Sequence, residues 1–213
     1  MVRVSEVPEP HRPLRPQLRG HWDDVTGEAD PADRTAVAHA TAAAVVRAGR
    51  GGDADPARTS RLVCLVDEVG LDELAELWQD SEGDTLPGTL WSLYLLRTWL
   101  QREGVEAARL FDAGRFVAEV SSAVAGVAEP PGPDEVAALG DAVLTSAFDG
   151  DFAVALERAG AFCRVISAGR AHLADVEPDP EAGERLTRLA GGNLRMAEQL
   201  EHAAQLWRCD ALV

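Results

Sequence analysis

Lysine is absent from this chain of 213 residues, and all 20 of its basic residues are arginine. Without a lysine amino group the chain can form no Schiff base, anchor no pyridoxal phosphate and supply no P-loop lysine. The three classes of enzyme that depend on those groups are therefore excluded.

Cysteine and histidine are also scarce. The cysteines are Cys64, Cys163 and Cys209, and no pair of them forms a C-x-x-C motif. The five histidines form neither H-E-x-x-H nor H-x-H. We therefore expect reduced thiols in a cytoplasmic protein, with no bound metal and no cofactor.

Long apolar runs and an excess of positive charge are missing as well. The first 20 residues contain no apolar core of a signal peptide, and the apolar window at residues 86–100 is shorter than the roughly 20 residues that a membrane span needs. The 36 acidic residues give a formal net charge of −16, which repels phosphate backbones. We expect neither a membrane nor a nucleic-acid partner.

The chain does contain residues that are typical of the starts and ends of helices. Aspartate–proline pairs at 30–31 and 55–56 are typical of helix starts, as are Pro87 and Asp134. No useful stretch alternates with the period of a strand. The pattern predicts an all-α fold, a bundle of seven to nine helices around a central Trp-rich helix. The pair Gly191-Gly192 predicts a kink or break in the last helix.

Two regions differ in composition. Residues 1–29 begin with 20 residues that hold four prolines and four arginines, and we expect a flexible arm there. Residues 30–213 are expected to form a single all-α domain. The last helix, 181–208, belongs either to the body of that domain or to an appendage on it.

The Trp-rich helix, LWSLYLLRTWLQREG at residues 90–104, is apolar around most of its circumference and carries one arginine, Arg97. A dry guanidinium needs an anionic partner, because an unpaired one costs several kcal/mol. The acidic candidates on the neighbouring helices are Asp67, Glu68, Glu73, Glu76, Glu106 and Asp112. Arg97 therefore forms an ion pair within the chain or across a subunit interface, or it receives a ligand carboxylate or phosphate in a pocket lined by Tyr94 and Gln101.

Two segments, LPGTLWSLYLLRTWLQREGVEAARLFDAGR and DAVLTSAFDGDFAVALERAGAFCRVISAGR, carry a resemblance. With the sequence around them, roughly residues 60–210, the chain resembles a conserved group of actinobacterial helical proteins of unknown function. The resemblance implies a cytoplasmic helical protein and carries over no catalytic or binding residue.

The absence of a catalytic motif favours a protein that is not an enzyme and that acts through protein–protein contacts as a homodimer. Tryptophans at helix positions are the expected interface anchors: Trp78, Trp91, Trp99 and Trp207. Two alternatives stay open. One is a sensor or enzyme for an anionic small molecule with a pocket between helices around Arg97. The other is an acidic transcription-associated regulator that binds a protein partner.

Overall fold

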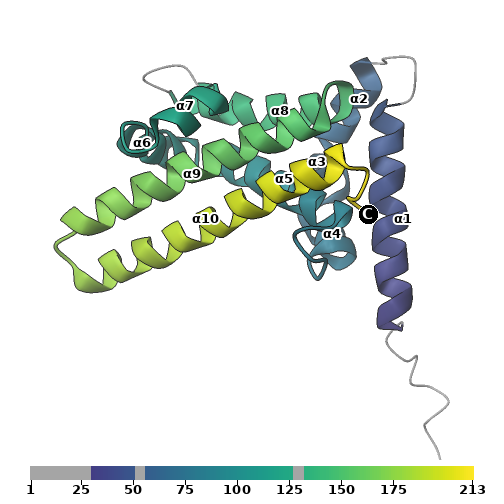
Figure 1. Cartoon of the computed structure of the whole chain (residues 1–213), viewed down its shortest axis with the longest axis horizontal. Helices are drawn as coiled ribbons and strands as arrows, with labels where there is room; N and C mark the ends of the chain where they lie inside the picture. Colours follow the sequence, from purple (N-terminus) through teal and green to yellow (C-terminus); the bar gives the residue numbers. More distant parts are fainter. Residues whose placement is uncertain (1–29, 51–55, 127–131) are drawn as a thin grey trace, which may run out of the picture. The chain divides into compact units, whose positions relative to one another are not determined.

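The computed structural model describes residues 30–50, 56–126 and 132–213, and this part of the chain contains ten α-helices and no strand (Figure 1). The all-α prediction is thus confirmed. The arm predicted at 1–29 lies outside the described residues. The helices are α1 (Pro31–Arg50), α2 (Pro56–Val63), α3 (Leu65–Val69), α4 (Leu71–Trp78), α5 (Leu86–Arg102), α6 (Gly104–Gly114), α7 (Glu119–Ala125), α8 (Pro133–Asp149), α9 (Phe152–Val176) and α10 (Pro180–Arg208).

The predicted start signals lie where the helices begin. Pro31 and Pro56 are the first residues of α1 and α2, and Pro87 stands in the first turn of α5. Proline suits this position because the first amide groups of a helix have no intrahelical acceptor. At α9, the Asp151 carboxylate caps the helix by accepting hydrogen bonds from the backbone N–H groups of Ala153 and Val154.

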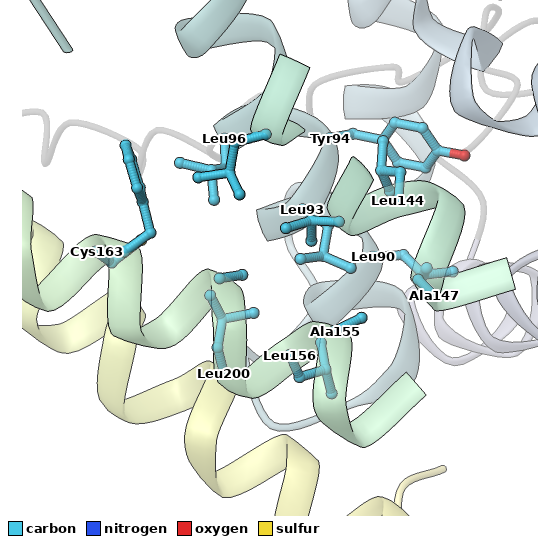
Figure 2. Packing of buried hydrophobic residues seen from close by; sticks show 14 of the residues in the cluster. Leu90, Leu93, Tyr94, Leu96, Leu144, Ala147, Ala155, Leu156, Cys163 and Leu200 are labelled. Atoms are coloured by element: carbon cyan, nitrogen blue, oxygen red, sulfur yellow. The ribbon is translucent and has the colours of Figure 1, made fainter. Parts of the chain in front are cut away.

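Helices α5 and α9 contribute the most buried residues among the described helices. The Trp-rich helix α5 packs against α1, α4, α6, α8 and α10, while α9 packs against α6, α7, α8 and α10. Figure 2 shows the labelled leucines of α5 facing Leu144 of α8 and Leu156 of α9. Each such fully buried side chain stabilises the fold by about 1.5–3 kcal/mol.

The described residues contain more helices than the seven to nine expected, because two helical stretches are interrupted. The stretch that follows the start signal at 55–56 breaks at Cys64, and the stretch that begins at Gly104 breaks between Gly114 and Glu119. In the second break, the N–H groups of Val117 and Ala118 both donate to the carbonyl of Gly114. The turn lets α6 and α7 each pack on α9.

Of the kink or break predicted at Gly191-Gly192, the break is wrong, because α10 runs unbroken through both glycines. Side chains from α9 support the helix on either side of the pair. Ser167 donates to the carbonyl of Ala190 at 2.9 Å, and Arg170 donates to the Asn193 side chain at 2.7 Å. These bonds support the helix around the two glycines, whose helix propensity is low.

Helices α9 and α10 form an antiparallel hairpin, side by side in Figure 1. Two bidentate ion pairs join them: Arg164 with Glu201, and Glu157 with Arg208. The members of the two pairs are spaced by seven residues on each helix, so both pairs lie on the same side of the hairpin. Residues Pro31–Val213 group into one compact unit, and α10 is part of that unit.

Candidate functional site

Arg97 is the most deeply buried charge among the described residues, with 2% of its surface exposed. It lies on the fourth turn of α5, between tightly packed apolar neighbours. Helix α8 approaches it closely, since a Cβ atom on Gly140 would stand 3.1 Å from the Arg97 Cα. The site is therefore built by the packing of α5 against α8.

Two carboxylates hold the Arg97 guanidinium. Its Nε donates to Asp141 Oδ1 on α8 at 2.6 Å, and its Nη2 donates to Asp67 Oδ2 on α3 at 2.9 Å. The Cys64 Sγ lies 3.8 Å from the same Nη2. Burial opposes the charged form of Arg97, but the hydrogen bonds that it donates to Asp67 and Asp141 and the charges of these carboxylates outweigh burial, so the pKa of Arg97 is raised.

The third nitrogen of this guanidinium, Nη1, is buried and has no hydrogen-bond partner among the described residues. An unsatisfied buried donor costs about 1–3 kcal/mol. The two carboxylates, by contrast, are only half-buried, with 52% of the Asp67 side chain and 48% of the Asp141 side chain exposed. The Arg97 guanidinium is therefore shielded from solvent, whereas the two carboxylates are partly exposed to it.

The sequence identified one of these partners and missed the other. Asp67 was among the six acidic candidates, whereas Asp141 was not, because it lies 44 positions from Arg97 on a helix that does not adjoin α5 in the chain. The neighbouring Gly140 is the feature of the sequence that could have indicated Asp141 as a partner. A glycine inside an otherwise regular helix marks a place where another backbone comes close.

Tyr94 and Gln101 do not complete an anion pocket with Arg97. The Tyr94 ring is fully buried, its hydroxyl donates to the carbonyl of Leu62 at 2.6 Å, and burial raises its pKa. Gln101 is exposed and donates to Asp141 Oδ1, the oxygen that Arg97 already uses. The chain's own carboxylates thus take up the Arg97 guanidinium, as in the ion-pair alternative within the chain.

The four tryptophans proposed as interface anchors differ in their burial. Trp78 is 1% exposed, stacks on Tyr94 and donates from its indole to the Thr41 hydroxyl at 3.0 Å. It is a core residue and offers no surface to a partner, so its assignment to an interface is wrong. Trp91, Trp99 and Trp207 are half-buried against the core.

Trp99 has a cationic neighbour that the sequence did not suggest. The Arg170 guanidinium of α9 lies 5.4 Å from the centre of the Trp99 ring, at a distance where cation–π attraction operates. Burial lowers the pKa of Arg170, and Glu106 opposes that shift. Arg170 thus links α9 to α5 through the ring and to α10 through Asn193.

Two open clefts lie elsewhere, and Arg97 lines neither. The first, about 500 Å³, runs between α1 and α4 and is lined by side chains that include Arg34, His39, Glu76 and Glu82. The second, about 600 Å³, lies between α10 and the loop before α5. Its lining residues are Glu82, Gly83, Asp84, Arg195, Glu198, Gln199 and His202. In this cleft, Glu82 and Asp84 of the loop lie opposite Arg195 and His202 of α10.

The described residues contain no group of three or more histidine, cysteine, aspartate or glutamate side chains arranged to hold a metal ion. Within the same residues, every helix is too short or too polar to cross a lipid bilayer. The three cysteines are free thiols. No protein-family model, curated protein or solved structure matches this chain.

Proposed function

We propose that this chain acts through protein–protein contacts and that it associates with itself as a homodimer. The observation that carries the proposal is the end of the α9–α10 hairpin. No residue from 171 to 189 is buried, so this part of the hairpin has no core of its own. Such a two-helix ribbon contributes little to the stability of the fold, and burial against a second molecule would give it a hydrophobic partner.

Apolar side chains stand exposed along this hairpin. Val176 is 66% exposed at the end of α9, and Leu189 and Leu194 are 43% and 38% exposed on α10. Exposed apolar groups gain about 25 cal/mol for each Å² that a partner covers. The free thiols fit a reducing compartment such as the cytoplasm, where we place the protein.

An anionic ligand at Arg97 is less well supported. Asp67 and Asp141 already occupy two donors of the guanidinium, and together they exceed its charge. A third anion would be repelled by that excess. Only the unpaired Nη1 favours a ligand.

Sedimentation velocity over a range of concentrations tests the proposal. We expect a dimer that weakens when Val176 and Leu189 are both changed to serine. A matched control changes Phe116 and Val117 to serine, because each is 70% exposed but stands outside the hairpin. A chain that stays monomeric at every concentration would disprove the homodimer, and a larger loss of association in the control would place the contact at Phe116 instead.

A further inference from the structure

The solvent face of α10 carries a stripe of five polar residues and one glycine at alternating spacings of three and four. The stripe consists of Arg185, Arg188, Gly192, Arg195, Gln199 and His202. Residues three and four apart lie on one helix face. This face is unusual in a chain whose formal net charge is −16, because no acidic residue interrupts the sequence from Arg185 to Ala197.

The three arginines of the α10 stripe are available to a partner. All three are exposed, and within the described residues none of them forms an ion pair. Glu184 and Glu198 flank the stripe without pairing to it. Between the arginines, Gly192 adds open space, since a Cβ atom there would meet nothing within 4 Å. With no side chain at position 192, another helix can approach this part of α10 closely.

The complementary charge lies on α3 and α4 of the same chain. Residues 65–78 contain five acidic residues and no basic one. Asp67 is engaged by Arg97, which leaves an exposed α3–α4 acidic face. That face consists of Glu68, Asp72, Glu73 and Glu76. None of these four carboxylates forms an ion pair within the part of the chain that the structure describes.

We propose that the α10 stripe of one copy docks on the α3–α4 acidic face of a second copy. The proposal rests on the homodimer proposed above and adds a charged contact to its apolar one, since Leu189 and Arg188 are neighbours on α10. Glu82 lines both clefts, the one beside Glu76 and the one beside Arg195, so the two faces adjoin through a single loop. Two copies related by a two-fold axis can therefore form the contact twice, which closes the assembly as a dimer.

Charge complementarity of this kind makes association depend on salt. The Debye length falls from about 30 Å at 0.01 M salt to about 3 Å at 1 M salt, so exposed ion pairs lose most of their attraction across that range. We expect the dimer dissociation constant, measured by sedimentation velocity, to rise by roughly tenfold or more over the same range. A dissociation constant that does not respond to salt would overturn the proposal.

Charge reversal identifies the surface. Arg185, Arg188 and Arg195 are changed together to glutamate, and the matched control changes Arg47, Arg61 and Arg102, which are also exposed. Both sets alter the net charge equally, so an effect of net charge alone would appear in both. We expect the stripe variant to be monomeric and the control to dimerise. Equal behaviour of the two variants would refute the assignment.

Mixing two reversed variants gives the sharpest test. In the second variant, Asp72, Glu73 and Glu76 are changed to arginine, so that its acidic face becomes basic. We expect each variant to be monomeric alone and the mixture to form a heterodimer, because the reversed stripe then meets the reversed face and the unchanged stripe meets the unchanged face, so both contacts pair opposite charges. Circular dichroism checks that each variant is folded. If the wild type is a dimer and each reversed variant also dimerises alone, the docking of the α10 stripe on the α3–α4 acidic face is disproved and the homodimer is not. If the wild type is a monomer, both proposals are disproved.

Discussion

The asymmetry of burial around Arg97 makes a directional prediction about its removal. Arg97→Met replaces the cation by an apolar chain of similar length, and the double variant Asp67→Ala/Asp141→Ala removes both of its partners. Because the guanidinium is 2% exposed and the carboxylates are about half-exposed, the two perturbations leave different groups behind. Arg97→Met leaves two hydrated carboxylates, while the double variant leaves a dry, unpaired cation.

The expected changes in the free energy of unfolding follow from this difference in the groups left behind. Removing the partners of a buried charge costs about 3–5 kcal/mol, because the charge stays out of water without compensation. Removing Arg97 forfeits two charge-assisted hydrogen bonds of about 1.5–3 kcal/mol each. It also removes the unsatisfied Nη1, at about 1–3 kcal/mol, and the desolvation cost of the guanidinium, at several kcal/mol. We therefore expect Arg97→Met to change the free energy of unfolding by less than about 1.5 kcal/mol.

Urea denaturation of the single, double and triple variants measures these values as a thermodynamic cycle. In the triple variant, Arg97→Met should restore stability that the loss of the two aspartates removed. Methionine at position 97 would then be stabilising in one background and nearly neutral in the other. If Arg97→Met alone costs as much as the double variant, or if it fails to rescue that variant, the reasoning from burial is wrong.

Two further predictions concern glycine packing and alkaline pH. Gly192→Ala should stabilise the monomer by about 1 kcal/mol because its Cβ meets open space, whereas Gly169→Ala should cost about 1–3 kcal/mol because its Cβ would stand 2.0 Å from the Leu110 carbonyl oxygen. Thermal melts compare the two, and a shift of the same sign in both would contradict the packing at Gly169. Burial raises the pKa of Cys163 from 9.0 to about 12, so the stability that the neutral thiol contributes is complete below pH 9.0 and is lost as the pH rises towards about 12. Melts over that range should fall less steeply in Cys163→Ala, and an unchanged slope would show that Cys163 does not titrate in this way.

Local signals in the sequence were sufficient to place the helices. An aspartate or proline at a helix start acts on amide groups within one turn, so its effect can be read without knowing the tertiary structure. The same locality explains the failures. The break at Cys64 and the continuity through Gly191-Gly192 coincide with contacts to α5 and α9, which no window of neighbouring residues contains.

The candidate site was predictable in part for a related reason. An arginine inside an apolar helix predicts an anionic partner, because the cost of leaving it unpaired is general. Which carboxylate pairs with it depends on the angle between helices. Asp141 enters the site because Gly140 lets α8 come against α5, and although a glycine inside a helix indicates a close approach, it does not indicate which helix approaches.

If Arg97 adds little to stability, its position still fixes the arrangement of the bundle. Nε and Nη2 bind carboxylates on two different helices, 44 and 30 residues away along the chain, at 2.6 and 2.9 Å. A planar fork can make both bonds only when α3, α5 and α8 lie in one register, and an apolar side chain imposes no such condition. We infer that Arg97 selects this packing against alternatives in which α8 slides along α5, so that Arg97→Met should broaden the conformational ensemble more than it lowers the free energy of unfolding.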